Sequence, residues 1–135
     1  MATITRFEDI EAWQFGRELK RLVYRCSKKG DFAKDFTLKD QIRRAAISIT
    51  ANIAEGFERE GNREFVQFLS TSKGSCGELQ DHLYTALDQS YVTQQEFDDL
   101  YQKAAEVGRK IGAFMNYLKR SDIRGRKFLQ VPGRA

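Results

Sequence analysis

The sequence contains few residues that break helices, cross-link a chain or bind metals. Its one proline is Pro132, so no proline interrupts the residues before it. Cys26 and Cys76 form no CxxC pair, and His82 is the single histidine. One histidine and two separated thiols are too few for a zinc site, so we predict no bound metal. We expect both thiols to be reduced and buried, because each falls among apolar residues at helical spacing.

The sequence also lacks the motifs of membrane proteins, secreted proteins and common enzymes. No apolar run has the length of a membrane span, and the opening MATITRFEDI lacks the apolar stretch of a secretory signal. Two unpaired cysteines without a signal predict a cytoplasmic protein with no membrane partner. There is no P-loop, GxGxxG or nucleophile elbow. Cys76 and His82 fall on opposite sides of a helix, so we predict no enzyme and no cofactor.

Basic residues exceed acidic ones by a small margin that lies mostly at the C-terminal end. Lysine and arginine number 23 and aspartate and glutamate 19, which gives a net charge of +4. The end of the chain contains Arg124, Arg126, Lys127 and Arg134 against the single acid Asp122. Residues 1–120 therefore hold a net charge of only +1. We predict that 1–120 form one domain and that 121–135 form a flexible basic tail.

Apolar residues repeat at helical spacing in four long segments. The segments cover about 8–28, 38–59, 63–89 and 94–118. In the first, the predicted core stripe is Ala12, Phe15, Leu19, Leu22 and Cys26. The predicted N-caps are Thr37, Asn62 and Thr93, the last in a capping box with Glu96. Short connections make consecutive helices antiparallel, so the predicted fold is all-α, an up-down-up-down four-helix bundle.

The second helix has more apolar surface than a single core face requires. Ile47, Ala51 and Ala54 extend its apolar stripe almost to the opposite side. A helix that is apolar nearly all round is buried nearly all round, so we predict that these three residues lie in a subunit interface. Small residues on the next helix, Ser70, Gly74 and Gly77, would permit a close approach of helices.

A narrow polar arc remains on the second helix. It consists of Arg44, Ser48, Asn52 and Glu55. The residues favour a polar network that fixes the register of the helices, with Glu55 paired to Arg44 or Arg59, over a ligand site.

One face of the first helix combines cations with an aromatic residue. The candidate nucleic-acid-binding residues are Arg17, Arg21, Tyr24, Arg25 and Lys28, together with Arg124, Arg126 and Lys127 of the tail. Guanidinium groups bind phosphates in a bidentate way, and a tyrosine can stack on a base. Lysine and arginine also populate any solvated helix face, so both interpretations stay open.

Three segments carry a resemblance to a known family. FEDIEAW, DQIRRAAISITANIAEGF and REFVQFLSTSKGSCGELQDHL resemble the four-helix proteins encoded in intervening sequences of bacterial 23S rRNA genes, over about residues 7–118. That family is similar to the accessory variability protein of diversity-generating retroelements, a ring-forming bundle. The resemblance implies a non-catalytic homopentamer whose partner is RNA or DNA, or a reverse transcriptase or other protein.

Two functions are therefore compatible with the sequence. The first is an RNA- or DNA-associated accessory oligomer of the rRNA intervening-sequence type. The alternative is a scaffold ring that binds a protein partner and no nucleic acid. The two differ in whether the basic face of the first helix contacts phosphates.

Overall fold

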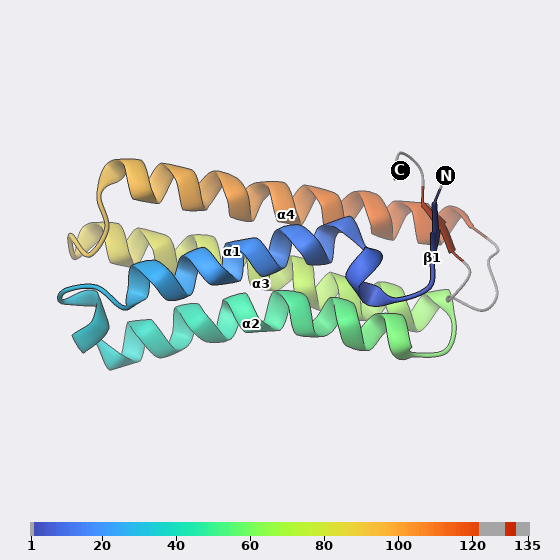
Figure 1. Cartoon of the computed structure of the whole chain (residues 1–135), viewed down its shortest axis with the longest axis horizontal. Helices are drawn as coiled ribbons and strands as arrows, with labels where there is room; N and C mark the ends of the chain where they lie inside the picture. Colours follow the sequence, from blue (N-terminus) through green and yellow to red (C-terminus); the bar gives the residue numbers. More distant parts are fainter. Residues whose placement is uncertain (1, 122–128, 132–135) are drawn as a thin grey trace.

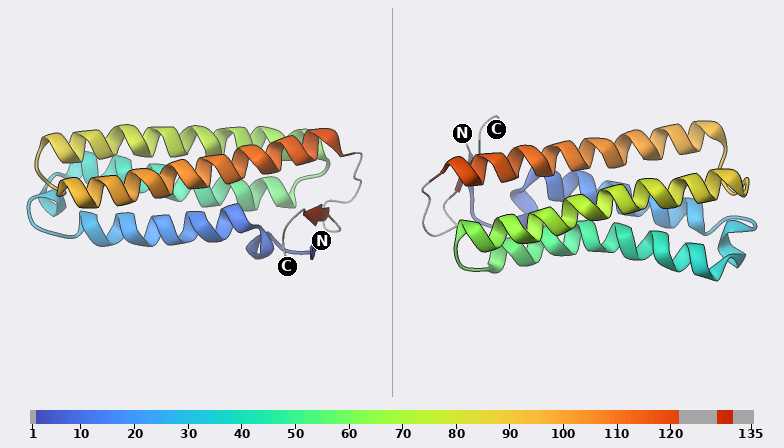
Figure 2. Two further views of the ribbon diagram at one scale, coloured as in Figure 1. Left: turned by 90° about the horizontal axis from the view of Figure 1, so that it is seen from above. Right: turned by 180° about the vertical axis from the view of Figure 1, so that it is seen from behind.

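The computed structural model describes residues 2–121 and 129–131 and contains four long helices. These are α1 (Glu11–Ser27), α2 (Phe36–Glu58), α3 (Asn62–Asp88) and α4 (Gln94–Arg120). They lie side by side, and consecutive helices run in opposite directions (Figure 1). Two further views show the same elongated bundle from above and behind (Figure 2). The all-α four-helix fold predicted from the sequence is confirmed.

Four short elements lie at the ends of the bundle. They are β1 (Ala2–Ile4), the 3-10 helix η1 (Phe7–Asp9), the 3-10 helix η2 (Phe32–Lys34) and β2 (Leu129–Val131). The two strands pair antiparallel, with Ala2 opposite Val131 and Ile4 opposite Leu129. The sequence predicted neither strand, because the pairing joins the two ends of the chain. Arg124, Arg126 and Lys127 lie outside the described residues.

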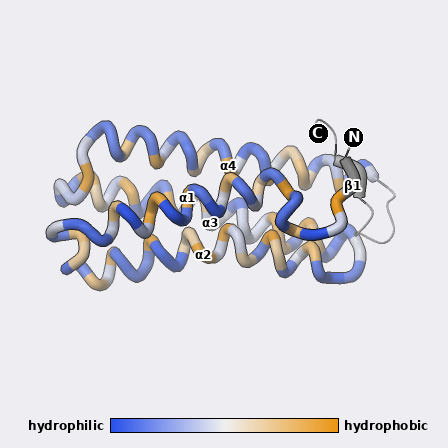
Figure 3. Tube along the Cα trace, viewed as in Figure 1, coloured by the Kyte–Doolittle hydropathy of each residue, from blue (hydrophilic) through white to orange (hydrophobic). Residues whose placement is uncertain are grey.

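Each helix buries an apolar stripe against its neighbours, and Figure 3 shows apolar residues recurring along all four. On α1 the stripe is rotated from the predicted one, since Phe15 is 37% exposed and Gly16 is buried. A Cβ on Gly16 would lie 3.1 Å from Thr50 Cγ2, so the glycine lets α1 approach α2 closely. No helix in the described part of the chain is long and apolar enough to cross a membrane.

Both cysteines are free and buried, as predicted. Burial raises the pKa of Cys26 to about 11 and that of Cys76 to about 12. A thiol with so high a pKa carries almost no thiolate at neutral pH, and the thiolate is the reactive form. The two cysteines therefore act as small apolar core residues.

The first helix starts later than predicted. Phe7–Asp9 form a separate 3-10 turn, and Ile10 adopts an extended conformation before α1 begins at Glu11. Ile10 is only 3% exposed, and Phe7 packs edge-on against Trp13 with ring centroids 5.2 Å apart. Burial of these apolar side chains thus breaks a helix that local spacing alone would extend to Glu8.

Two of the three predicted N-caps are wrong. Asp35, rather than Thr37, caps α2, since Asp35 Oδ1 accepts the Leu38 N–H at 3.0 Å. Asn62 is the first residue of α3, and its N-cap is Gly61, with φ at 84°. The third prediction is confirmed, because Thr93 forms a complete capping box with Glu96.

The cap at Asp35 also joins two loops at one end of the bundle. Tyr91, in the connection between α3 and α4, donates its hydroxyl to Asp35 Oδ2 at 2.9 Å. The bond from the Leu38 N–H, followed by that from Tyr91, lowers the pKa of the Asp35 carboxyl. The ring of Tyr91 stacks on Phe32, with the ring centroids 5.3 Å apart. The capping carboxylate thus holds the start of α2 to the α3–α4 connection.

We expect Asp35→Asn to lower the melting temperature at pH 7 by a few degrees, although asparagine can still cap a helix. The folded-state pKa of Asp35 lies below its unfolded value, so its stabilisation is present above the unfolded pKa and is lost as pH falls through the folded one. The difference between wild type and variant should therefore shrink below about pH 4. Thermal unfolding, monitored by circular dichroism at several pH values, measures the melting temperatures of both proteins.

Asp31→Asn is the matched control, since Asp31 is exposed and its carboxylate lies 4.0 Å from Lys34 Nζ. The Asp31→Asn change also removes one negative charge close to the start of α2. Equal losses for both variants at every pH would contradict the role given to Asp35.

Candidate nucleic-acid interface

Three cations of α1, the cation at its C-cap and one apolar residue of α2 surround a shallow groove. The groove, called the basic groove below, has a volume of about 530 Å³. It is lined by Lys20, Arg21, Tyr24, Arg25, Lys28 and Ile47. Arg17 lies one helical turn before Arg21 and is exposed, with its guanidinium 5.9 Å from the centroid of the Trp13 ring. The structure therefore places Arg21, Tyr24, Arg25 and Lys28 of the predicted basic face along one hollow, whereas Arg17 lies outside its lining.

Lys20 is a member of this groove that the sequence did not single out. Its Nζ donates to Thr50 Oγ1 at 2.9 Å, across the contact between α1 and α2. Partial burial, followed by the nearby charge of Arg17, lowers the pKa of Lys20. Among the described residues, no carboxylate forms an ion pair with this lysine. A half-buried cation held by a neutral hydroxyl keeps its charge available to an anion from outside.

Tyr24 is only partly available for stacking. The guanidinium of Arg43, from α2, lies 4.4 Å from the ring centroid and covers one face. Arg43 Nε also donates to Ser27 Oγ at 2.8 Å, which fixes this cation in place. The aromatic ring therefore has one occupied face, and Arg43 adds a positive charge that sequence reasoning missed. Its position depends on the packing of α1 against α2, for which the spacing within one helix gives no signal.

Acidic side chains do little to neutralise the basic groove. Arg21 Nη1 lies 3.6 Å from Glu18 Oε2, and both side chains are more than half exposed. An exposed pair of this kind contributes little energy, so Glu18 is easily displaced by a stronger anion. In the part of the chain that the structure describes, Arg25 and Lys28 form no ion pair with a carboxylate. The groove therefore keeps a local excess of positive charge although the domain is nearly neutral.

The three residues predicted as a subunit interface lie on one side of α2, because they follow each other at intervals of four and three residues. Ile47 is 43% exposed and lines the basic groove. Ala54 is half-buried and lies one turn after Thr50, at the edge of this side next to α1. Ala51 is exposed on the outer face. Of the three, Ala51 is thus the residue best placed to meet a second chain.

The neighbouring helix α3 exposes small residues beside the middle of α2. Ser75 Oγ donates to Ser48 Oγ at 2.8 Å, which aligns this part of α3 with the middle of α2. Gly74 and Gly77 are exposed, and a Cβ on either would meet no described atom within 4 Å beyond its chain neighbours and the nearby backbone of α3. A glycine inside a helix costs up to about 1 kcal/mol relative to alanine. Packing within the described chain therefore requires neither glycine.

The polar arc of α2 does not form one continuous network. Its residues are Arg44, Ser48, Asn52 and Glu55. Asn52 Nδ2 donates to the Ser48 carbonyl and to Ser48 Oγ, at 2.8 and 2.9 Å. Glu55 pairs with Arg59 at 2.7 Å, one of the two predicted partners. Arg44 instead pairs with Asp40 at 3.1 Å, because both lie on the exposed side one turn apart.

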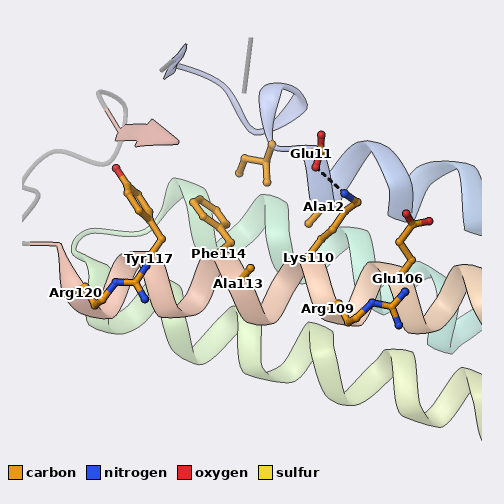
Figure 4. Close-up of a pocket in the computed structure, with 10 residues that line it drawn as sticks. Glu11, Ala12, Glu106, Arg109, Lys110, Ala113, Phe114, Tyr117 and Arg120 are labelled. Atoms are coloured by element: carbon orange, nitrogen blue, oxygen red, sulfur yellow. Dashed lines mark hydrogen bonds and ion pairs between the residues drawn. The ribbon is translucent and has the colours of Figure 1, made fainter. Parts of the chain in front are cut away.

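A second hollow, of about 490 Å³, lies where α4 continues past the start of α1 (Figure 4). Lys110 Nζ and Glu11 Oε1 form an ion pair across it at 2.7 Å. Arg109 and Arg120 lie on its rim, but eleven residues of helix separate their backbones by about 16 Å. Two cations so far apart do not converge on one anion, and Glu106 offsets part of their charge. This hollow is the weaker candidate for an anion site.

The single histidine has an ordinary structural role. His82 Nε2 lies 3.3 Å from Glu78 Oε2, one helical turn away. Nowhere in residues 2–121 and 129–131 do three histidine, cysteine, aspartate or glutamate side chains gather in a way that would hold a metal ion.

Comparisons with known proteins place the chain in a family. A solved structure of a protein with unknown function from the S23 ribosomal protein family of Bacteroides thetaiotaomicron VPI-5482 is 20% identical, with a TM-score of 0.69. The similarity covers 77% of this chain and 97% of that one, and at this identity it shows a shared fold. A search of curated proteins found no match. The profile of the 23S rRNA-intervening sequence proteins matches residues 8–113. With most of its length matched, the chain belongs to the family of 23S rRNA-intervening sequence proteins.

Proposed function

We propose that the protein is a non-catalytic oligomer that binds nucleic acid through the phosphates, using the basic groove between α1 and α2. The observation that carries the proposal is the lack of neutralisation in the groove. Lys20 is held by Thr50 rather than by a carboxylate, and Arg25 and Lys28 have no ion-paired acid in the described chain. A phosphate backbone supplies the negative charge that the groove lacks.

The chemistry of the groove suits phosphate oxygens better than isolated carboxylates. Arg21 and Arg25 present planar guanidinium forks, which bind phosphates in a bidentate way. Lys20 and Lys28 contribute ammonium groups on flexible stems. A row of such cations along one helix favours a polyanion, because each phosphate contact releases a bound counterion.

The same proposal includes assembly through the outer surface of α2 and α3, next to the basic groove. Ala51, Gly74 and Gly77 leave a surface of small residues on the outside of the bundle. We propose that a second copy packs there, as part of a ring with the five subunits that the family resemblance implies. Several grooves on one ring would multiply modest contacts into a useful avidity. Such binding would require no strongly basic domain.

Replacing Arg17, Arg21 and Arg25 together with glutamine should weaken the binding of RNA or DNA roughly tenfold or more at low salt, because two cations of the groove and the neighbouring Arg17 are lost. Fluorescence anisotropy with a labelled oligonucleotide measures the change. The matched control replaces Arg109, Lys119 and Arg120 of α4 with glutamine. These three residues are exposed, and their replacement removes the same amount of positive charge. If both triple variants weaken binding equally, net charge rather than the groove is responsible.

A protein partner is the second candidate function, and one observation favours it. Phe36, at the start of α2, is 72% exposed, and Tyr84 on α3 is 50% exposed. Exposed aromatic side chains are common anchors of protein interfaces. If the intact protein binds neither RNA nor DNA at low ionic strength, the protein-scaffold function replaces the nucleic-acid one.

A further inference from the structure

Resting on the function proposed above, we propose that the basic groove takes a single nucleic-acid strand, with an unpaired base packed against Tyr24 and Ile47. The two side chains come from different helices and line the same groove as the cations. A duplex also presents phosphates to the cations. The apolar and aromatic part of the groove therefore determines whether a single strand or a duplex binds more tightly.

The cations form one row along α1. Arg21, Arg25 and Lys28 follow each other at intervals of four and three residues, which is about 6 and 4.5 Å along the helix axis. The row spans about 10 Å and has no parallel partner row in the groove. This geometry matches the backbone of one strand, whereas a duplex presents two backbones on a wide rod.

Ile47 distinguishes the groove from a simple phosphate site. It is 43% exposed, although it lies among four cations. An isoleucine makes no favourable contact with a phosphate, but its surface suits the flat face of a base. In a duplex the base faces are hidden by stacking, and only an unpaired base can present its face to a side chain.

Tyr24 is held in position for such a contact. Arg43 lies over one face of the ring at 4.4 Å and is itself anchored by its 2.8 Å bond to Ser27. The ring therefore loses little conformational freedom when a base packs against its remaining surface. Proteins that bind single strands without sequence preference commonly combine a cationic groove for the backbone with an aromatic side chain on which a base stacks.

The test compares four probes in a fluorescence competition assay at low salt. They are a uridine RNA of about 12 nucleotides, the matching thymidine DNA, an RNA duplex of the same length, and inorganic polyphosphate as a polyanion without bases. Both single strands should bind at least roughly fivefold tighter than the duplex. Tyr24→Leu should weaken single-strand binding by roughly five- to a hundredfold and leave polyphosphate unchanged.

Tyr24→Phe keeps the ring and should bind single strands like the wild type, which separates stacking from a role of the hydroxyl. Leucine keeps an apolar side chain at this position, so a purely structural role of the ring would be largely rescued in Tyr24→Leu. Duplex binding as tight as single-strand binding, or equal weakening of all four probes by Tyr24→Leu, would overturn the single-strand proposal and leave phosphate binding standing. Failure of every probe to bind would overturn both.

Discussion

Replacing Ala51 with glutamate is expected to reduce the protein in solution to a single chain of 15.6 kDa. Ala51 is exposed on the outer face of α2, so the new carboxylate meets water in the isolated chain and leaves the core intact. In an assembly the same carboxylate would be buried against a second copy without a partner, which costs several kcal/mol. Five chains, about 78 kDa, should therefore separate while the helix content is unchanged.

Light scattering coupled to gel filtration measures the mass, and far-ultraviolet circular dichroism measures the helix content. Gln102→Glu is the matched control, since Gln102 is exposed on α4, away from α2. A wild-type mass near 15.6 kDa would contradict assembly altogether. A large mass that persists in Ala51→Glu would show that the subunits meet through another surface.

Replacing Gly56 with alanine is expected to lower the free energy of unfolding by about 2 kcal/mol. A Cβ at this position would lie 2.7 Å from Phe68 Cβ and 2.8 Å from Phe65 Cδ1. Phe65 is fully buried and packs edge-on against Phe57 and Phe114, so it has no space into which to move. Overpacking of this kind costs about 1–3 kcal/mol, and the better helix propensity of alanine recovers at most about 1 kcal/mol.

Gly77→Ala is the control for this prediction, because a Cβ there meets no described atom within 4 Å beyond its chain neighbours and the nearby backbone of α3. In the Ala51→Glu background, which removes subunit contacts, Gly77→Ala should raise the stability by up to about 1 kcal/mol. Chemical denaturation measures both variants. An increase for Gly56→Ala as well would contradict the close approach of α2 and α3.

The sequence predicted those parts of the fold that depend on local spacing. Four helices follow from apolar periodicity, and the capping box of Thr93 and Glu96 lies within one helical turn. The misplaced features depend on distant residues. Asp35 is fixed in part by Tyr91, 56 residues away, and β1 pairs with β2 from the other end of the chain. Gly16 joins the core because α2 lies against it.

The candidate site likewise contains residues that helical spacing predicts and residues that only helix packing places there. Arg21, Arg25 and Lys28 share a face because helical spacing requires it, and the structure places them along one groove. Lys20 and Arg43 were missed, since their positions depend on Thr50, Ser27 and the contact between α1 and α2. Sequence alone therefore predicts which residues carry charge, whereas helix packing determines which charges remain without a partner.

The most direct test of phosphate binding in the basic groove is the salt dependence of single-strand affinity. About four contacts from one groove predict that the logarithm of the binding constant falls with the logarithm of the salt concentration with a slope of roughly −3. Replacing Arg17, Arg21 and Arg25 with glutamine removes two of the four groove cations and should flatten the slope to about −1.5, whereas replacing Arg124, Arg126 and Lys127 should leave most of it. A slope that survives the first triple change and disappears with the second would contradict binding in the groove.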